Sequence, residues 1–241
     1  MGEGVATDVA LVKGVRLVAA IVIAIGLPVL LLTNAVRSVM LDEGFYVSEF
    51  AKYRVSSVTG LSNTELQRVA GAFITYFQSD PGDLNLSVTT STAGTVQLFT
   101  DREVHHMRDV QILMHRVLQL WALALVAMAV AAIAIIATGP RTSAPTILRA
   151  TAIGGGTAVL LVGAMSLAAA VDFQGLFLQF HFMSFANDLW LLDPRRDRLI
   201  QLFPEGYFFD AAMRIGIQTV GLGLAALVAS VGLLFAVKRP T

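Results

Sequence analysis

The sequence predicts an all-α membrane protein with four transmembrane helices, both termini in the cytoplasm, and a small α+β subdomain outside the membrane. Hydrophobic residues make up 56% of its 241 residues and charged residues 14%. Soluble domains average about 45–50% apolar and about 25% charged residues. Mean hydropathy is +0.71. This composition indicates an integral membrane protein, and we treat residues 1–241 as one domain.

Four apolar runs are long enough to cross a hydrocarbon core of about 30 Å. They cover about residues 15–36, 117–137, 151–171 and 211–237. The third and fourth runs are rich in glycine, which lets helices approach one another closely. We therefore expect these two spans to pack tightly through Gly154, Gly155, Gly156, Gly163, Gly216, Gly221, Gly223 and Gly232.

Basic residues in short flanks predict the orientation, because cytoplasmic flanks are enriched in Lys and Arg. Three flanks carry such pairs, which predicts that both termini are cytoplasmic and that the connections at about 38–108 and 172–210 face outward. The pairs are Lys13 with Arg16, Arg141 with Arg149, and Lys238 with Arg239.

The first outer segment, about 38–108, has the pattern of a small subdomain. Ser62 and Glu65 form a capping box that predicts a helix up to Asp80. Alternating apolar residues in 84–98 predict a β-hairpin. Thr100 and Glu103 form a second capping box, which opens a helix that continues into the second span. On that helix a polar stripe should face protein or a wet cavity: Arg108, Gln111, His115 and Gln119.

The second outer segment, about 172–210, contains a histidine between aromatic residues. Phe177, His181 and Phe185 recur every four residues, so they share one helix face. Either His181 has a chemical function, or it is an interfacial histidine that bonds a backbone carbonyl. Asp193 and Pro194 predict a short helix with Asp193 as its N-cap, through about residue 202.

Histidines and acids occur in both outer segments, and both segments adjoin span ends at the same predicted face. The first has His105, His106 and Asp109; the second has His181 with Asn187 and Asp188. A histidine is the simplest general base near neutral pH. A metal site is the weaker alternative, because adjacent histidines on a helix point about 100° apart.

Other classes of chemistry lack their usual sequence signals. There is no cysteine, and neither a G-x-S-x-G elbow nor a phosphate-binding glycine loop occurs. The net charge of zero argues against nucleic acid as a partner. We expect neither a metal nor another cofactor.

The outer motifs together resemble those of a known family. The sequence Glu103-x-x-His106-Met107-x-Asp109-Val110 is followed by Phe180-His181-x-x-x-Phe185-x-Asn187-Asp188-x-Trp190-x-Leu192-Asp193-Pro194-x-x-Asp197-x-Leu199-Ile200 and by Phe203-Pro204-Glu205-x-x-Phe208-Phe209. This combination is similar to the bacterial lipoprotein intramolecular transacylases and covers most of the chain.

The resemblance implies a multi-pass enzyme of the bacterial cell membrane whose partners are the lipid bilayer and a diacylated lipoprotein. It would move the middle acyl chain of the diacylglyceryl group to the α-amino group of the N-terminal cysteine, at the extracytoplasmic face, and give a lyso-form lipoprotein. The family's two functional histidines match His106 and His181.

We assign His106 as base and His181 as acid or polarising group, with the order interchangeable. His105 stands where the family pattern has a small or polar residue, so either His105 or His106 faces the site. Asp109 lies one helical turn from His106 and is a candidate to orient its ring by a hydrogen bond. Further candidates for orienting or binding the substrate are Asn187, Asp188, Trp190, Glu205 and His105.

Two other functions fit the residues without the resemblance. One is a non-enzymatic membrane scaffold or receptor whose outer subdomain binds a partner. The other is a metal-dependent lipid hydrolase.

Overall fold

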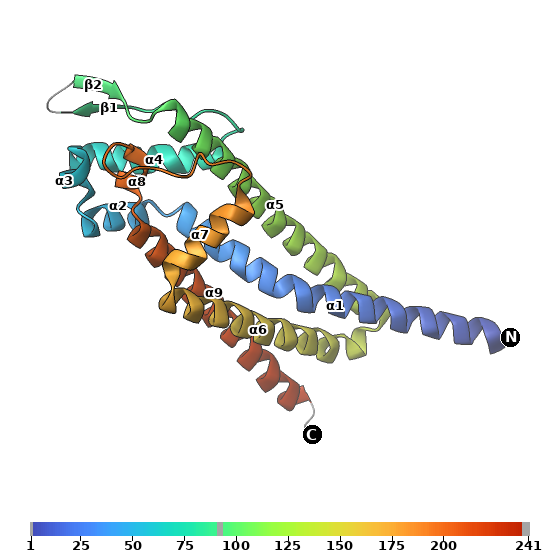
Figure 1. Ribbon diagram of the computed structural model, residues 1–241. Coiled ribbons are helices and arrows are strands. Elements are labelled where there is room, and N and C mark those ends of the chain that lie inside the picture. Colours follow the sequence, from blue (N-terminus) through green and yellow to red (C-terminus); the bar gives the residue numbers. More distant parts are fainter. Residues whose placement is uncertain (1, 91–93, 238–241) are drawn as a thin grey trace. The chain divides into compact units, whose positions relative to one another are not determined.

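The computed structural model of the chain describes residues 2–90 and 94–237 (Figure 1). Four helices are long and apolar enough to cross a membrane, as predicted: Val9–Met40, Asp101–Thr138, Pro140–Val171 and Glu205–Val237. Lys238 and Arg239, used above for orientation, lie outside the described residues, and the cytoplasmic position of the termini stays a prediction. In chain order the elements are α1 (Gly2–Met40), α2 (Glu43–Lys52), α3 (Val55–Thr59), α4 (Asn63–Gln78), β1 (Ser87–Thr90), β2 (Gly94–Gln97), α5 (Asp101–Thr138), α6 (Pro140–Val171), α7 (Phe173–Ser184), α8 (Arg198–Leu202) and α9 (Glu205–Val237).

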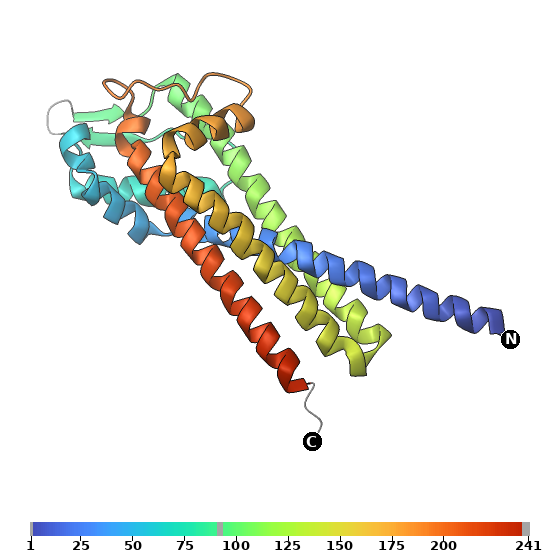
Figure 2. The same ribbon diagram turned by 60° about the horizontal axis from the view of Figure 1, so that its bottom comes forward.

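The chain divides into two compact units, whose boundaries fall inside the four long helices. Unit 1 comprises Met1–Ala35, Leu118–Ser166 and Ile215–Thr241, and unit 2 comprises Val36–Val117 and Leu167–Arg214. Figure 2 shows the same elements from a second direction. Unit 1 therefore holds most of the apolar helix length, and unit 2 holds both outer segments of the sequence.

Unit 1 is packed through glycines where α6 meets its neighbours. A Cβ atom added to Gly155 would lie 2.7 Å from the carbonyl oxygen of Gly223, and one added to Gly223 would lie 3.0 Å from that of Gly155. At Gly154 the Cβ would lie 2.9 Å from the carbonyl oxygen of Ala24. The Gly155–Gly223 contacts confirm the close approach predicted for the third and fourth spans. The expectation is wrong for Gly156, Gly221 and Gly232, because an added Cβ there has no described neighbour within 4 Å.

Arg16 joins three helices of unit 1. Its Nη1 donates to the carbonyl oxygens of Ile135 (3.0 Å) and Gly139 (3.3 Å). Its Nη2 donates to the carbonyl oxygen of Thr142 and to Thr146 Oγ1, each at 2.9 Å. The last carbonyls of a helix lack partners within it and favour a nearby cation. Arg16 on α1 supplies both the hydrogen-bond donors and the positive charge at the turn between α5 and α6.

Unit 2 has an aromatic core built from its short helices. Phe73 on α4 lies edge-on to Phe203 with ring centroids 4.9 Å apart, and Phe203 lies edge-on to Tyr207 at the same distance. Tyr46 on α2 packs on both Phe73 and Phe203. Aromatic pairs of this geometry add about 0.5–1.5 kcal/mol each to the burial of their apolar area. These rings hold α2, α4 and the start of α9 around the segment after α8.

The predicted subdomain forms as expected. Ser62 Oγ accepts from the backbone N–H of Glu65 at 3.2 Å and caps α4. Strands β1 and β2 are antiparallel, with Val88 opposite Val96. Residues 91–93 of the predicted turn lie outside the described residues.

The predicted polar stripe on α5 packs against the loop after α4. Gln111 is wholly buried; its side chain accepts from the Gly82 N–H at 2.9 Å and donates to the Tyr76 carbonyl at 2.6 Å. The His115 Nε2 atom lies 3.1 Å from the Phe77 carbonyl oxygen. Gln119, the fourth member, is exposed. Gln111 and His115 of the stripe therefore face protein.

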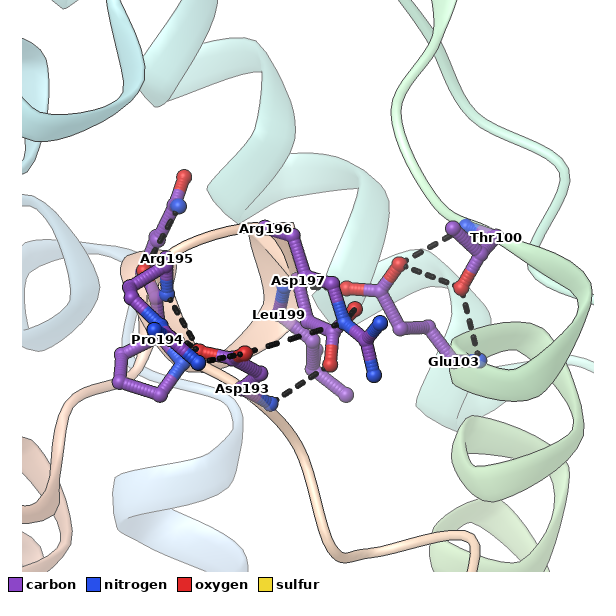
Figure 3. Close-up of polar contacts among 9 residues, drawn as sticks. Thr100, Glu103, Asp193, Pro194, Arg195, Arg196, Asp197 and Leu199 are labelled. Carbon is purple, nitrogen blue, oxygen red and sulfur yellow. Dashed lines mark hydrogen bonds and ion pairs between the residues drawn. The ribbon is translucent and has the colours of Figure 1, made fainter.

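The predicted helix start at Asp193 is wrong. Helix α8 begins at Arg198, with Asp197 in the N-cap position. Asp193 instead closes a turn: its carboxylate accepts from the Arg195 N–H at 3.0 Å, and its carbonyl accepts from the Asp197 N–H at 2.8 Å (Figure 3). The Asp197 carboxylate accepts in return from the Asp193 N–H at 2.6 Å. Local Asx-type bonding therefore replaces the first helical turn.

Glu103 links the start of α5 to the start of α8, as Figure 3 shows. Its side chain has no exposed surface. Oε2 accepts from both the backbone N–H and the hydroxyl of Thr100, each at 2.8 Å, which confirms the second capping box. Oε1 accepts from the backbone N–H of Leu199 at 2.6 Å. One carboxylate thus serves two helix starts that are far apart in sequence.

Glu103→Gln should destabilise unit 2 by about 2–3 kcal/mol, because an amide NH₂ replaces one buried acceptor and leaves a backbone N–H unpaired. The measurement is thermal unfolding of the purified protein in detergent micelles. Glu65→Gln is the matched control, since Glu65 holds the same motif position at α4 but is partly exposed. Equal melting temperatures for the two variants would contradict this role of Glu103.

Gly155→Ala should destabilise the protein by about 1–3 kcal/mol, because the new Cβ would clash with backbone atoms of α9, which cannot change rotamer as a side chain can. Gly156→Ala is the control, since among the described residues nothing lies within 4 Å of a Cβ at that position. Thermal unfolding in detergent should separate the neighbouring variants. A Gly155→Ala protein as stable as Gly156→Ala would show that α6 and α9 do not need this contact.

Candidate active site

The two histidines named from the sequence lie together in unit 2. His106 is in the second turn of α5, and His181 is on α7. Their ring centroids are 6.4 Å apart with an interplanar angle of 31°. Only 7% of His106 and 9% of His181 is exposed. Two segments 75 residues apart therefore bring two buried imidazoles to one place.

His181 is fixed by the backbone of its own helix. Its Nδ1 lies 2.7 Å from the carbonyl oxygen of Phe177. A carbonyl only accepts, so Nδ1 carries the proton, and the neutral ring keeps its lone pair on Nε2. Burial lowers the pKa of His181 from its ordinary value, although the bond to Phe177 opposes this. The backbone bond expected of an interfacial histidine is thus present, and it also leaves Nε2 ready to accept a proton.

His106 is held by ring packing. Its ring lies edge-on to Phe185 with centroids 5.1 Å apart and an interplanar angle of 73°. Its Nδ1 atom is buried and has no hydrogen-bond partner among the described residues. A buried polar atom without a partner is costly and calls for an explanation. A reacting group placed between the histidines would provide one.

Trp190 covers the His181 ring from the loop after α7. The two ring centroids are 4.9 Å apart with an interplanar angle of 35°. The indole N–H donates to the carbonyl oxygen of Asn187 at 2.9 Å. Trp190 therefore has its polar group committed and presents an apolar wall to the site.

Asn187 joins this loop to α5. Its Nδ2 donates to Asp109 Oδ2 at 2.8 Å, and its Oδ1 accepts from the Leu189 N–H at 3.1 Å. Within the described part of the chain, Asp109 makes no hydrogen bond to His106. Asp109 thus acts on the loop that carries Trp190, and its suggested direct bond to His106 is not formed.

Arg102, which the motifs did not single out, ties the same loop to α5. It donates to the backbone carbonyl of Asp188, and its Nη2 lies 3.7 Å from the Asp188 carboxylate. Arg102 lies one helical turn before His106, and this spacing was the signal available in the sequence.

The remaining candidates lie apart from the imidazoles. His105 is exposed, whereas His106 is buried, so His106 is the one of the pair that faces His181. Glu205 is exposed in the first turn of α9. Within residues 2–90 and 94–237, no group of three or more His, Asp or Glu side chains is arranged to hold a metal ion.

A groove of about 670 Å³ lies at the junction of α6 and α7, but it does not include the histidines. Its lining from α7 includes Gly175, Leu176 and Gln179. Gln179 is two residues from His181, so the two project about 200° apart around the helix. The groove therefore opens on the other face of α7.

The chain resembles solved structures of one protein over nearly its full length. The membrane integral lipoprotein intramolecular transacylase Lit from Bacillus cereus matches with a TM-score of 0.76 and 19% identity, over 94% of this chain and 99% of that one. Variants of that protein with a histidine changed to alanine or to arginine match with TM-scores of 0.72 and 0.69. The alanine variant is 17% identical, over 95% of this chain and 98% of its own. The arginine variant is 19% identical, over 98% of this chain and 97% of its own. These likenesses establish the fold.

Sequence comparison gives the family. No curated protein matches the chain. Residues 21–208 match the family described as lipoprotein intramolecular transacylase Lit. This match includes both histidines, the loop after α7, and three of the four long helices in whole or large part. The chain belongs to the lipoprotein intramolecular transacylase family and is a multi-pass membrane protein.

Proposed function

We propose that the protein moves the middle acyl chain of a diacylglyceryl lipoprotein to the α-amino group of its N-terminal cysteine. The observation that carries this proposal is the buried pair of His106 and His181, in a member of a transacylase family. Ester and amine belong to one substrate, so positioning them together gives the large advantage of an intramolecular reaction.

The reaction balances without a cofactor. The amine lone pair attacks the ester carbonyl carbon and forms a C–N bond. The bond between that carbonyl carbon and the glyceryl oxygen then breaks. The amine loses one proton and the glyceryl oxygen gains one, giving an amide and a free hydroxyl. A pair of groups that takes one proton and gives another is therefore what the reaction requires.

The fixed tautomer of His181 supports its role as the base. Its Nε2 lone pair is free because Nδ1 donates to Phe177, and its lowered pKa keeps the ring neutral near pH 7. An α-amine has a pKa of about 7.7–8.0, so part of it is already neutral at that pH. His106 then donates toward the leaving glyceryl oxygen while its other nitrogen takes up the proton that His181 removed from the amine, so both rings end neutral. This order is the reverse of our first assignment from sequence, which left it interchangeable.

We place this site at the extracytoplasmic face. The positive-inside pattern supports that face, since unit 2 contains both outer segments. The acyl chains stay in the hydrocarbon beside the spans, and the glyceryl and cysteine groups reach the imidazoles. The rows of aromatic side chains on α7 and at the start of α9 suit a membrane interface.

His106→Ala and His181→Ala should each lower acyl migration by about 10²–10⁴-fold, because each removes one proton-transfer group. The measurement is mass spectrometry of the N-terminal peptide of a diacylated lipoprotein co-expressed with each variant. His105→Ala is the matched control and should keep the wild-type product, since His105 is the exposed neighbour.

Three results of that experiment would contradict the proposal. Unchanged product with either buried histidine removed would exclude that residue from the mechanism. Free fatty acid without N-acylated peptide would indicate a hydrolase. A folded wild-type protein that leaves the lipoprotein unaltered would favour a scaffold or receptor.

The rate should fall as the pH drops below the amine pKa of about 7.7–8.0, and it should fall more steeply below a second midpoint that lies under pH 6.5, the ordinary histidine value. Burial lowers the pKa of His181, so its neutral, proton-accepting form persists to lower pH than in water. Protonation also opposes burial of the ring, so thermal stability should decline as the pH falls from about 6.5 to the His181 midpoint and should level off below it. NMR titration of His181 in the purified protein, read against the pH–rate profile, checks both. A His181 midpoint above pH 6.5 would rule out this account.

A further inference from the structure

Arg102 holds donors that the fold does not use. Its Nε is buried and has no hydrogen-bond partner among the described residues. One terminal nitrogen, Nη2, is committed to Asp188. Guanidinium is always charged and carries five N–H groups in a fixed plane, so a buried Nε–H without an acceptor is an unmet demand for an anion or a carbonyl oxygen.

The position of Arg102 places its unpaired N–H donor near the two histidines. Arg102 and His106 are four residues apart on α5 and share a helix face. The Arg102 side chain is 39% exposed, and its Nε is the part that is buried. Its partner Asp188 belongs to the loop whose Trp190 lies on His181. The guanidinium therefore borders the place where the two imidazoles meet.

Acyl transfer between ester and amine needs such a donor. Attack on the carbonyl carbon moves an electron pair to the carbonyl oxygen, which becomes negative in the tetrahedral intermediate. Fixed donors aimed at this oxygen commonly contribute the largest single stabilisation. Side-chain N–H donors of the loop are already committed: the Asn187 amide to Asp109 and the Trp190 indole to the Asn187 carbonyl, while Arg195 and Arg196 pair with acids of the loop itself.

We propose that Arg102 is a catalytic residue that binds the substrate's carbonyl oxygen and stabilises its negative charge. This inference rests on the proposed function and adds a third group to it. The two histidines move protons, and Arg102 stabilises the negative charge that forms on the carbonyl oxygen between those transfers. When the intermediate collapses, the electron pair returns to the carbonyl, the C–O bond breaks, and the guanidinium keeps its proton throughout.

Arg102→Gln should lower kcat by about 10²–10³-fold with little change in KM, because the lost interaction strengthens only as charge develops. Arg102→Lys keeps the charge without the planar fork and should recover part of that loss. The matched control is Arg108→Gln, which removes an exposed arginine of the same helix that pairs with Asp83 at 2.5 Å. The assay is N-acyl peptide formation from a diacylated lipopeptide in mixed micelles.

Arg102 also holds the loop, so a second measurement separates the two roles. Added guanidinium chloride at low millimolar concentration should restore activity to Arg102→Ala if a guanidinium is needed at the reacting oxygen. Trp190 fluorescence, recorded in a Trp121→Phe background, reports whether the loop has moved.

Four outcomes decide the matter. Loss of kcat with rescue and unchanged fluorescence supports the proposal. Wild-type kcat in Arg102→Gln overturns it and leaves the proposed function intact. Loss without rescue, accompanied by a fluorescence shift, overturns it in favour of a positioning role. Absence of product from the wild-type protein itself removes the proposed function, and the role of Arg102 with it.

Discussion

The buried carboxylate of Glu103 is the constraint on which the site depends. A charge with no exposed surface is tolerated because both oxygens accept strong hydrogen bonds, from Thr100 and from Leu199. These bonds fix Thr100, the residue before α5, and the start of α8 together. His106 is the third residue after Glu103, so its direction follows from the register set there. A cap that is worth about 1 kcal/mol on an exposed helix here sets the direction of His106, which we propose as a catalytic residue.

The proposed site makes very few polar contacts for the proton transfers that we assign to it. His181 is oriented by a carbonyl oxygen and by ring contacts with Phe177 and Trp190, and His106 by Phe185. No carboxylate bonds to either ring within the described residues. This differs from a Ser-His-Asp site, where an acid stabilises the charged imidazole. Apolar surroundings keep the imidazole neutral, which suits a base that takes a proton from an amine close to a lipid phase.

Much of this could be predicted from local pattern. The four spans, the helix after Ser62, the hairpin and the cap at Thr100 are short-range features, and each formed as expected. Long-range partners were the difficulty. Asp193 and Asp197 both fit an N-cap, and only the reciprocal bonds of the folded turn select Asp197. Likewise, spacing placed Asp109 beside His106, whereas its oxygen is taken by Asn187, 78 residues away. Arg102 was overlooked because its partner is mainly a main-chain carbonyl, which no motif records.

The bond from His181 to Phe177 has an evolutionary consequence. Its acceptor is a main-chain oxygen, so any residue at position 177 that keeps α7 helical supplies it. The tautomer of the imidazole is thereby encoded in the helix itself and is insulated from drift in the side chains around it. A scaffold of this kind can diverge to 19% identity while retaining its shape, as the Bacillus cereus structure illustrates. The helical backbone, more than any neighbouring residue, preserves the state of this histidine.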